Sequence, residues 1–143
     1  HQWKGARWGL TTTLGHYAYP DTSFDYDYSD LSVVVDFRGR YFYGITYTDD
    51  LSSLGAAAID HEIGLAHALP AEIELSASLG SFDVEGPRGT DYTHYNVGAT
   101  RLVGRFALDL RYYETSREVI SYFGTSATDR WVLSLSYAIR PRN

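Results

Sequence analysis

The residues before the end of the chain alternate between large apolar and small side chains. From Trp131 to Ile139 the odd positions carry tryptophan, leucine, tyrosine and isoleucine, and the even positions carry valine, serine and alanine. Successive side chains of a β-strand point to opposite faces, so this period of two predicts a strand with one bulky apolar face. A soluble sandwich would place charges on its second face, which here carries serine and alanine. The length also matches the roughly 9 to 11 residues with which a tilted strand crosses a membrane.

The same alternation recurs along the chain and predicts eight strands. The segment Ala57 to Leu69 is rich in alanine and leucine, which favour a helix, but its strict alternation from Ile59 onward favours a strand. The expected strands are Ala6 to Tyr19, Leu31 to Phe37, Tyr41 to Thr48, Ala57 to Leu69, Ile73 to Phe82, Tyr92 to Val103, Phe106 to Glu114 and Trp131 to Ile139.

The connections between these strands alternate in length. The short turns are Arg38 to Arg40, Pro70 to Ala71 and Gly104 to Arg105, and the long connections are Asp21 to Asp30, Asp49 to Gly55, Asp83 to Thr90 and Thr115 to Thr128. In an up-and-down sheet all short turns then lie at one rim. Outer-membrane barrels have short periplasmic turns and longer extracellular loops. We therefore predict an all-β fold, an eight-stranded antiparallel up-and-down transmembrane β-barrel, with extracellular long loops and periplasmic termini.

The two faces of the expected strands differ in kind. One carries large apolar residues, and the other carries Gly, Ser, Thr and Ala. Charges embedded in the small face form the expected polar core of the lumen, namely Asp36, Glu62, Glu74, Asp109 and Arg111. Alternation alone does not say which face is inside, and a soluble barrel would reverse the assignment. The sparse charges, with Lys4 as the only lysine, favour the membrane arrangement, because an eight-stranded interior holds little more than side chains.

Aromatic residues make up 15% of the chain, including 13 tyrosines. Those near strand ends are expected to form girdles at the two membrane interfaces. The girdle residues are Trp8, Tyr41, Tyr47, Tyr112, Trp131 and Tyr137. Four polar residues interrupt the apolar face, His16, His61, His67 and Arg101, and all four are expected near a rim rather than at the bilayer midplane.

Composition narrows the remaining classes. The chain has no cysteine, and its net charge of −6 argues against nucleic acid as a partner. No apolar run approaches the roughly 20 residues of a membrane helix. Residues 1–143 are expected to form a single β-barrel domain. The lack of methionine at position 1 suggests a processed or fragmentary chain. The expected partner is the lipid bilayer, with other envelope proteins or copies of the chain as further candidates.

No residue pattern points to catalysis. The lumenal carboxylates with Arg111 could form an acid–base or ion-conducting group, but buried charges must be paired in any fold, which favours a packed polar core. His94 lies near Asp91, yet no Gly-x-Ser-x-Gly motif accompanies them. The spacing of Asp25, Asp27 and Asp30 lacks the glycine and closing glutamate of a calcium-binding EF-hand. We expect no enzymatic activity, no cofactor and no metal.

Several short motifs resemble one family. They are Tyr17-Ala18-Tyr19-Pro20, Asp25-Tyr26-Asp27-Tyr28, Tyr47-Thr48-Asp49-Asp50, Leu69-Pro70-Ala71, Leu79-Gly80, Asp91-Tyr92-Thr93, Val97-Gly98 and Val132-Leu133-Ser134-Leu135-Ser136. Together they resemble the Gcw_chp family of conserved hypothetical proteins of Gram-negative bacteria. The resemblance implies an outer-membrane β-barrel and brings no catalytic residues. Family members are typically longer and carry Phe-Arg-Gly near their start, whereas Phe37-Arg38-Gly39 here lies in an expected turn. The chain is then either a short member with eight strands or one that lacks N-terminal strands.

The sequence thus favours a small outer-membrane barrel whose interior is filled by polar side chains, with a structural or loop-mediated role. Three alternatives stay open. They are a narrow, porin-like pore, a subunit of a larger envelope assembly, and a soluble ligand-binding β-barrel.

Overall fold

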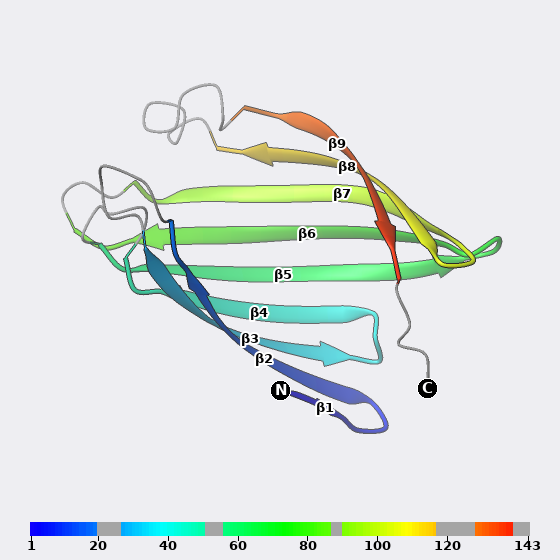
Figure 1. Ribbon diagram of the computed structural model, residues 1–143, viewed down its shortest axis with the longest axis horizontal. Helices are drawn as coiled ribbons and strands as arrows, with labels where there is room; N and C mark the ends of the chain where they lie inside the picture. Colours follow the sequence, from blue (N-terminus) through cyan, green and yellow to red (C-terminus); the bar gives the residue numbers. More distant parts are fainter. Residues whose placement is uncertain (20–26, 51–55, 87–89, 117–127, 139–143) are drawn as a thin grey trace.

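Nine strands form a single sheet in the computed structural model, which describes residues 1–19, 27–50, 56–86, 90–116 and 128–138 (Figure 1). They are β1 (Gln2–Lys4), β2 (Trp8–Tyr17), β3 (Tyr28–Phe37), β4 (Tyr41–Thr48), β5 (Ala58–Leu69), β6 (Ile73–Val84), β7 (Tyr92–Val103), β8 (Phe106–Thr115) and β9 (Arg130–Tyr137). Each strand pairs antiparallel with the next along the chain. The predicted all-β, antiparallel up-and-down sheet is confirmed, and the described residues contain no helix.

The period of two located most strand boundaries closely. β4 and β7 have the predicted bounds, and β5 includes the alanine-rich segment that could have been a helix. β2 is shorter than expected at both ends, whereas β3 begins three residues earlier, at Tyr28, within the expected loop. The predicted end of the last strand, Ile139, lies outside the described residues, as does a part of each long connection.

β1 is an additional strand that the sequence pattern missed. Gln2–Lys4 pairs with Thr11 to Gly9 of β2, and three residues are too few to show a period of two. The backbone of His1 also exchanges two hydrogen bonds with Thr12, of 2.8 and 2.9 Å. His1 therefore lies beside the middle of β2. β1 thus folds back along the sheet, and the periplasmic location of the termini stays a prediction.

All the tight turns lie at one rim of the sheet. This short-turn rim comprises residues 5–7, 38–40, 70–72 and 104–105, and the amide of Arg38 donates to the carbonyl of Arg7 across 2.6 Å. Left-handed backbone at Arg38, Gly39 and Gly104 (φ 58°, 60° and 62°) matches the turns that right-twisted hairpins favour. Ala71 and Glu72 adopt the same conformation without glycine, with φ of 62° and 57°.

The described sheet is open at both edges. β9 pairs only with β8, and no pairing joins it to β1 or β2 within the described residues. β2 and β9 run at a steep angle to β5 and β6, which shows how strongly the sheet is coiled (Figure 1). Closure into an eight-stranded barrel is therefore not a property of the described sheet.

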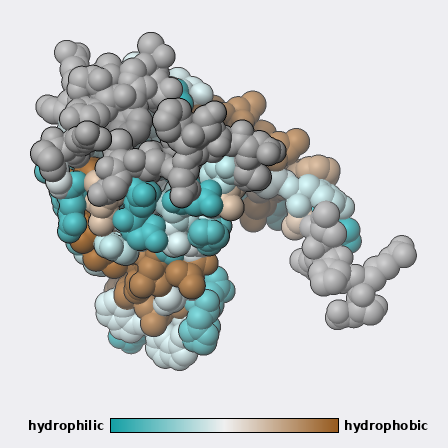
Figure 2. Space-filling view, turned by 60° about the vertical axis from the view of Figure 1, so that its left-hand side comes forward, coloured by the Kyte–Doolittle hydropathy of each residue, from teal (hydrophilic) through white to brown (hydrophobic). Residues whose placement is uncertain are grey.

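The apolar face has no second layer over it. Among the described residues the only buried ones are small, namely Thr48, Ala56, Ala58 and the glycines Gly9, Gly44 and Gly80, so these residues form no conventional core between layers. The large side chains of one face are instead exposed, most of all Leu14 (79%) on β2 and Leu135 (69%) and Leu133 (68%) on β9. Hydrophobic and hydrophilic surface separate into distinct patches (Figure 2). The division into two faces that the sequence predicts is thus retained in the folded sheet.

A close contact on the small face explains one of its glycines. The ring of Phe42 lies over Gly64, and a side chain at Gly64 would place its first carbon 2.2 Å from that ring. Glycine in a strand commonly marks such an approach. The small face therefore holds a large aromatic ring only because the neighbouring strand has no side chain there.

Candidate functional site: the polar face of the sheet

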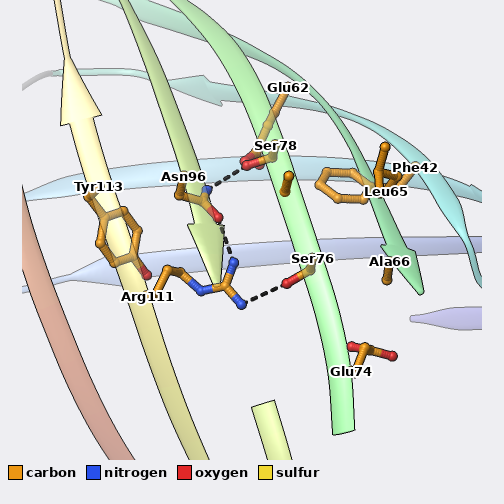
Figure 3. Close-up of a pocket in the computed structure, with 11 residues that line it drawn as sticks. Phe42, Glu62, Leu65, Ala66, Glu74, Ser76, Ser78, Asn96, Arg111 and Tyr113 are labelled. Atoms are coloured by element: carbon orange, nitrogen blue, oxygen red, sulfur yellow. Dashed lines mark hydrogen bonds between the residues drawn. The ribbon is translucent and has the colours of Figure 1, made fainter. Parts of the chain in front are cut away.

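Arg111 is the centre of the largest hydrogen-bond network on the small face. Its guanidinium donates to the Asn96 side-chain oxygen at 2.6 Å and to the Ser76 hydroxyl at 2.8 Å (Figure 3). It also donates to Asp109 at 3.1 Å. The side-chain amide of Asn96 donates in turn to Ser78 at 2.5 Å, and the Thr100 hydroxyl donates to Asp109 at 2.7 Å. We call these six residues, from β6, β7 and β8, the Arg111 cluster.

The register of the sheet explains how Arg111 reaches across a strand. Gly98 lies between Ser76 and Arg111 in the pairing of β6, β7 and β8. A side chain at Gly98 would begin 3.1 Å from the Cβ and Cγ atoms of Arg111. The glycine therefore leaves the path along which the arginine side chain crosses β7. Sequence reasoning selected Asp109 and Arg111 but missed Asn96, Ser76, Ser78 and Thr100, which only the register brings together.

A groove of about 390 Å³ lies beside this cluster, with Phe42, Tyr113, Glu62 and Glu74 among its lining residues (Figure 3). Glu62 is half-buried and Glu74 is exposed. Within the described part of the chain neither carboxylate forms a hydrogen bond or a salt bridge. The groove thus contains one arginine held by hydrogen bonds and two carboxylates without a hydrogen-bond partner among the described residues.

Asp36 shares the small face but not this groove. Its Oδ1 accepts a hydrogen bond of 3.3 Å from the Gly39 amide, and its carboxylate lies over Gly9. It lines a second groove, of about 710 Å³, at the short-turn rim with Lys4, Arg7 and Arg38. The five predicted core residues therefore occupy two separate places on one face, and the interior position of that face stays a prediction.

His94 pairs with a different aspartate from the one that its sequence neighbourhood suggested. Its Nε2 lies 2.9 Å from Asp60 on β5, whereas Asp91 accepts the backbone amide of Val84 at 2.9 Å. The His94–Asp91 pairing weighed in the sequence is therefore wrong. His94 and Asp60 are 34 residues apart in the sequence. No serine belongs to this pair, so it lacks the nucleophile of a Ser-His-Asp triad.

Two aspartates at the rim of the long connections accept hydrogen bonds from backbone amides. Asp49 accepts the Ser29 amide at 2.7 Å, and Asp27 accepts the Tyr19 amide at 2.8 Å. The hydrogen bond from Ser29 lowers the pKa of Asp49. These carboxylates hold strand ends together where the ladder stops. Asp25, of the weighed calcium motif, lies outside the described residues, and the described part of the chain contains no group of three or more metal-binding side chains.

The predicted girdle aromatics divide between the two ends of the sheet. Trp8 contacts Phe37 at a ring-centroid distance of 4.6 Å, and Tyr137 contacts Phe106 at 5.0 Å, both next to the short turns. Tyr41 begins β4 at the same rim. Near the long connections lie Tyr47 and the pair Tyr112–Trp131, whose rings are 5.3 Å apart. Phe37 and Phe106, which complete two of the contacts, were missed because only Tyr and Trp were considered.

The histidines on the apolar face have polar partners. His61 hydrogen-bonds with the Tyr43 hydroxyl at 2.7 Å, and His16 hydrogen-bonds with Ser29 at 3.2 Å. Both lie toward the long connections, whereas His67 and Arg101 lie within three residues of the short-turn ends of β5 and β7. None of the four breaks the alternation, so the register agrees with the predicted faces.

Comparison with known proteins adds no identification. No family model, curated protein or solved structure matches this chain. A search of the described residues for a helix with the length and apolarity to cross a membrane found none. Function must therefore be inferred from the sheet, its two faces and the Arg111 cluster.

Loss of the Arg111 guanidinium is expected to destabilise the fold. In Arg111→Gln, Asp109 loses its charged partner and two strands lose their link, which should cost about 1.5 to 3 kcal/mol of unfolding free energy. Asp109→Asn combined with Arg111→Gln should cost less than the sum of the single changes. Equilibrium urea unfolding of the refolded protein measures this. Arg130→Gln at the opposite rim is the control, and equal losses in the two arginine variants would contradict the assignment.

Proposed function

We propose that this protein is a small outer-membrane β-barrel without enzymatic activity, with a structural or loop-mediated role. In this proposal the large apolar face contacts lipid and the Arg111 cluster fills part of the lumen. The short-turn rim faces the periplasm and the long connections face the outside. Membership of the Gcw_chp family is part of the proposal and rests on the short motifs.

One observation carries the proposal, namely a sheet whose bulky apolar face is exposed while its opposite face holds internally bonded charges. On β8 the exposed side chains Phe106, Leu108 and Leu110 alternate with Asp109 and Arg111, which bond to each other. An apolar surface of this extent is unfavourable in water and marks an interaction with lipid or protein. In a bilayer, contact between this apolar face and lipid would stabilise the fold. A lysine or arginine on the same face at the bilayer midplane would instead cost about 2 to 4 kcal/mol.

Strand direction favours closure between β2 and β9. In an up-and-down sheet β1 and β9 run in the same direction, so only β2 can pair with β9 in the antiparallel way that such barrels use. β1 and His1 cover β2 only as far as Thr12, so its edge from Thr13 onward has no partner among the described residues. Pairing there would also cover Leu14, Leu133 and Leu135, the most exposed apolar side chains.

The faces restrict the register of this closure. A shift by one residue would send every side chain of a strand to the opposite face. Thr13 on the small face must therefore lie opposite an even-numbered residue of β9, and we propose Ser134 or Ser136. Leu14 then adjoins the leucines of the large apolar face. Tilted strands in a barrel are staggered relative to each other. This stagger would allow β9 to pair with β2 from Thr13 onward, beyond the part that β1 and His1 cover. The eight strands β2 to β9 would then form the closed barrel, and β1 would lie beside the part of β2 next to the short-turn rim.

The proposal predicts that folding requires an amphiphile. We expect the chain to fold when diluted from urea into detergent micelles and to aggregate in plain buffer, because its apolar face then lacks a partner. On a gel, the folded protein should migrate differently before and after heating. A monomer that folds in detergent-free buffer would contradict the proposal and favour a soluble ligand-binding barrel.

A narrow pore is the second candidate, and the groove with Glu62 and Glu74 favours it. Carboxylates without partners beside an open polar path suit the passage of cations. The sealed barrel predicts no stepwise currents when the protein is inserted into planar bilayers. Cation-selective steps that lose their selectivity in Glu62→Gln or Glu74→Gln would instead establish the pore, and Glu85→Gln at the other rim is the matched control.

A further inference from the structure

The charges of the described residues are strongly segregated along the strands. Most of the cations lie at or next to the short-turn rim, namely Lys4, Arg7, Arg38, Arg40, Arg101 and Arg105. The acidic residues gather at the opposite end, namely Asp27, Asp30, Asp49, Asp50, Asp83, Glu85, Asp91, Glu114 and Asp129. Near the short-turn rim the described carboxylates are Asp36, Glu72, Glu74 and Asp109, of which Asp109 is paired with Arg111. One end of the sheet therefore carries a net positive charge although the chain is acidic.

None of the six rim cations is neutralised within the described part of the chain. Its two ion pairs are His94–Asp60 and Arg111–Asp109, and neither involves the short-turn rim. If these arginines formed salt bridges within the protein, those salt bridges would explain why the arginines lie together, and no ligand would be needed. Because such a network is missing there, the rim presents free positive charge to its surroundings.

Two corners of this rim repeat one arrangement of an arginine beside an outward aromatic pair. At the first, the guanidinium of Arg38 lies 5.1 Å from the ring centre of Phe37, which contacts Trp8. At the second, the guanidinium of Arg105 donates to the hydroxyl of Tyr137 at 3.4 Å, and Tyr137 contacts Phe106. In each corner the aromatic rings belong to the apolar face and the guanidinium belongs to the turn.

The first corner also adjoins the groove that Asp36 lines at the short-turn rim. Its volume is about 710 Å³, and Lys4, Arg7 and Arg38 line it together with Trp8. The one carboxylate that lines it, Asp36, accepts the Gly39 amide. The groove opens at the rim on the side of the small face, and three of its lining residues are cations against one carboxylate.

We propose that the short-turn rim binds the phosphate groups of anionic phospholipids, with the Arg38 and Arg105 corners as its two sites. Guanidinium groups bind phosphate oxygens in a bidentate manner, and aromatic side chains favour the boundary between headgroups and acyl chains. A lipid with net negative charge gains from cations that have no other partner, whereas a zwitterionic lipid gains less. This inference rests on the proposed membrane-spanning function.

Lipid selectivity tests the inference. The full chain is refolded into phosphatidylcholine vesicles that contain a trace of spin-labelled phosphatidylglycerol or spin-labelled phosphatidylcholine. Electron spin resonance then gives the fraction of each label immobilised at the protein. We expect wild type to retain phosphatidylglycerol preferentially. Arg38→Gln and Arg105→Gln should each reduce this preference by up to about fivefold, the scale on which one basic residue acts near an anionic surface.

The controls separate this inference from the function on which it rests. Arg130→Gln removes an exposed arginine at the opposite rim and should leave the preference unchanged, and added salt should weaken the preference of wild type. A protein that inserts and shifts mobility on heating, but retains both lipids equally, overturns the inference and leaves the barrel intact. A protein that does not insert into phosphatidylcholine contradicts the barrel, and the inference fails with it.

Discussion

The alternation of large and small side chains constrains every other feature of this sheet. With a period of two, a register slip of one residue in any strand would move its leucines to the polar face and its charges to the apolar face. The observed pairing avoids this throughout, since Leu110 lies opposite Ala99 and Leu133, while Arg111 lies opposite Gly98 and Val132. Each hairpin must therefore hold its register, which the tight turns do with left-handed backbone even where the chain offers alanine or glutamate.

The small face has to accommodate charges without a second layer, and it does so by combining glycines with long polar side chains. Gly98 lets Arg111 cross β7, and Gly64 lets Phe42 lie flat on β5. This pairing of glycines with long side chains would suit the interior of a narrow barrel, which has room for side chains and little else. The two faces therefore support the same proposal, in which lipid covers the large apolar face and closure of the sheet encloses the small face.

What the sequence could predict depended on how local the signal was. Strand positions, turn positions and the membership of each face follow from neighbouring residues, and these agree with the sheet from Trp8 to Tyr137. The partners of Arg111 and His94 could not be predicted, because Ser76 and Asp60 lie 35 and 34 residues away and meet them only through the register of intervening strands. β1 was too short to show a pattern, and the rim arginines became meaningful only when all short turns were seen at one edge.

Closure of the sheet is the central claim, and a disulfide between β2 and β9 tests it most directly. The chain has no cysteine of its own, so Thr13→Cys can be combined with Ser134→Cys or with Ser136→Cys in the refolded protein. Thr13→Cys with Ser32→Cys is the positive control, because these residues lie opposite each other in β2 and β3. A disulfide forms only when the Cα atoms approach to about 4.4 to 6.8 Å. The account predicts an intramolecular disulfide for one of the two test pairs. A disulfide in the control alone would show that β2 and β9 stay apart, and would contradict the barrel.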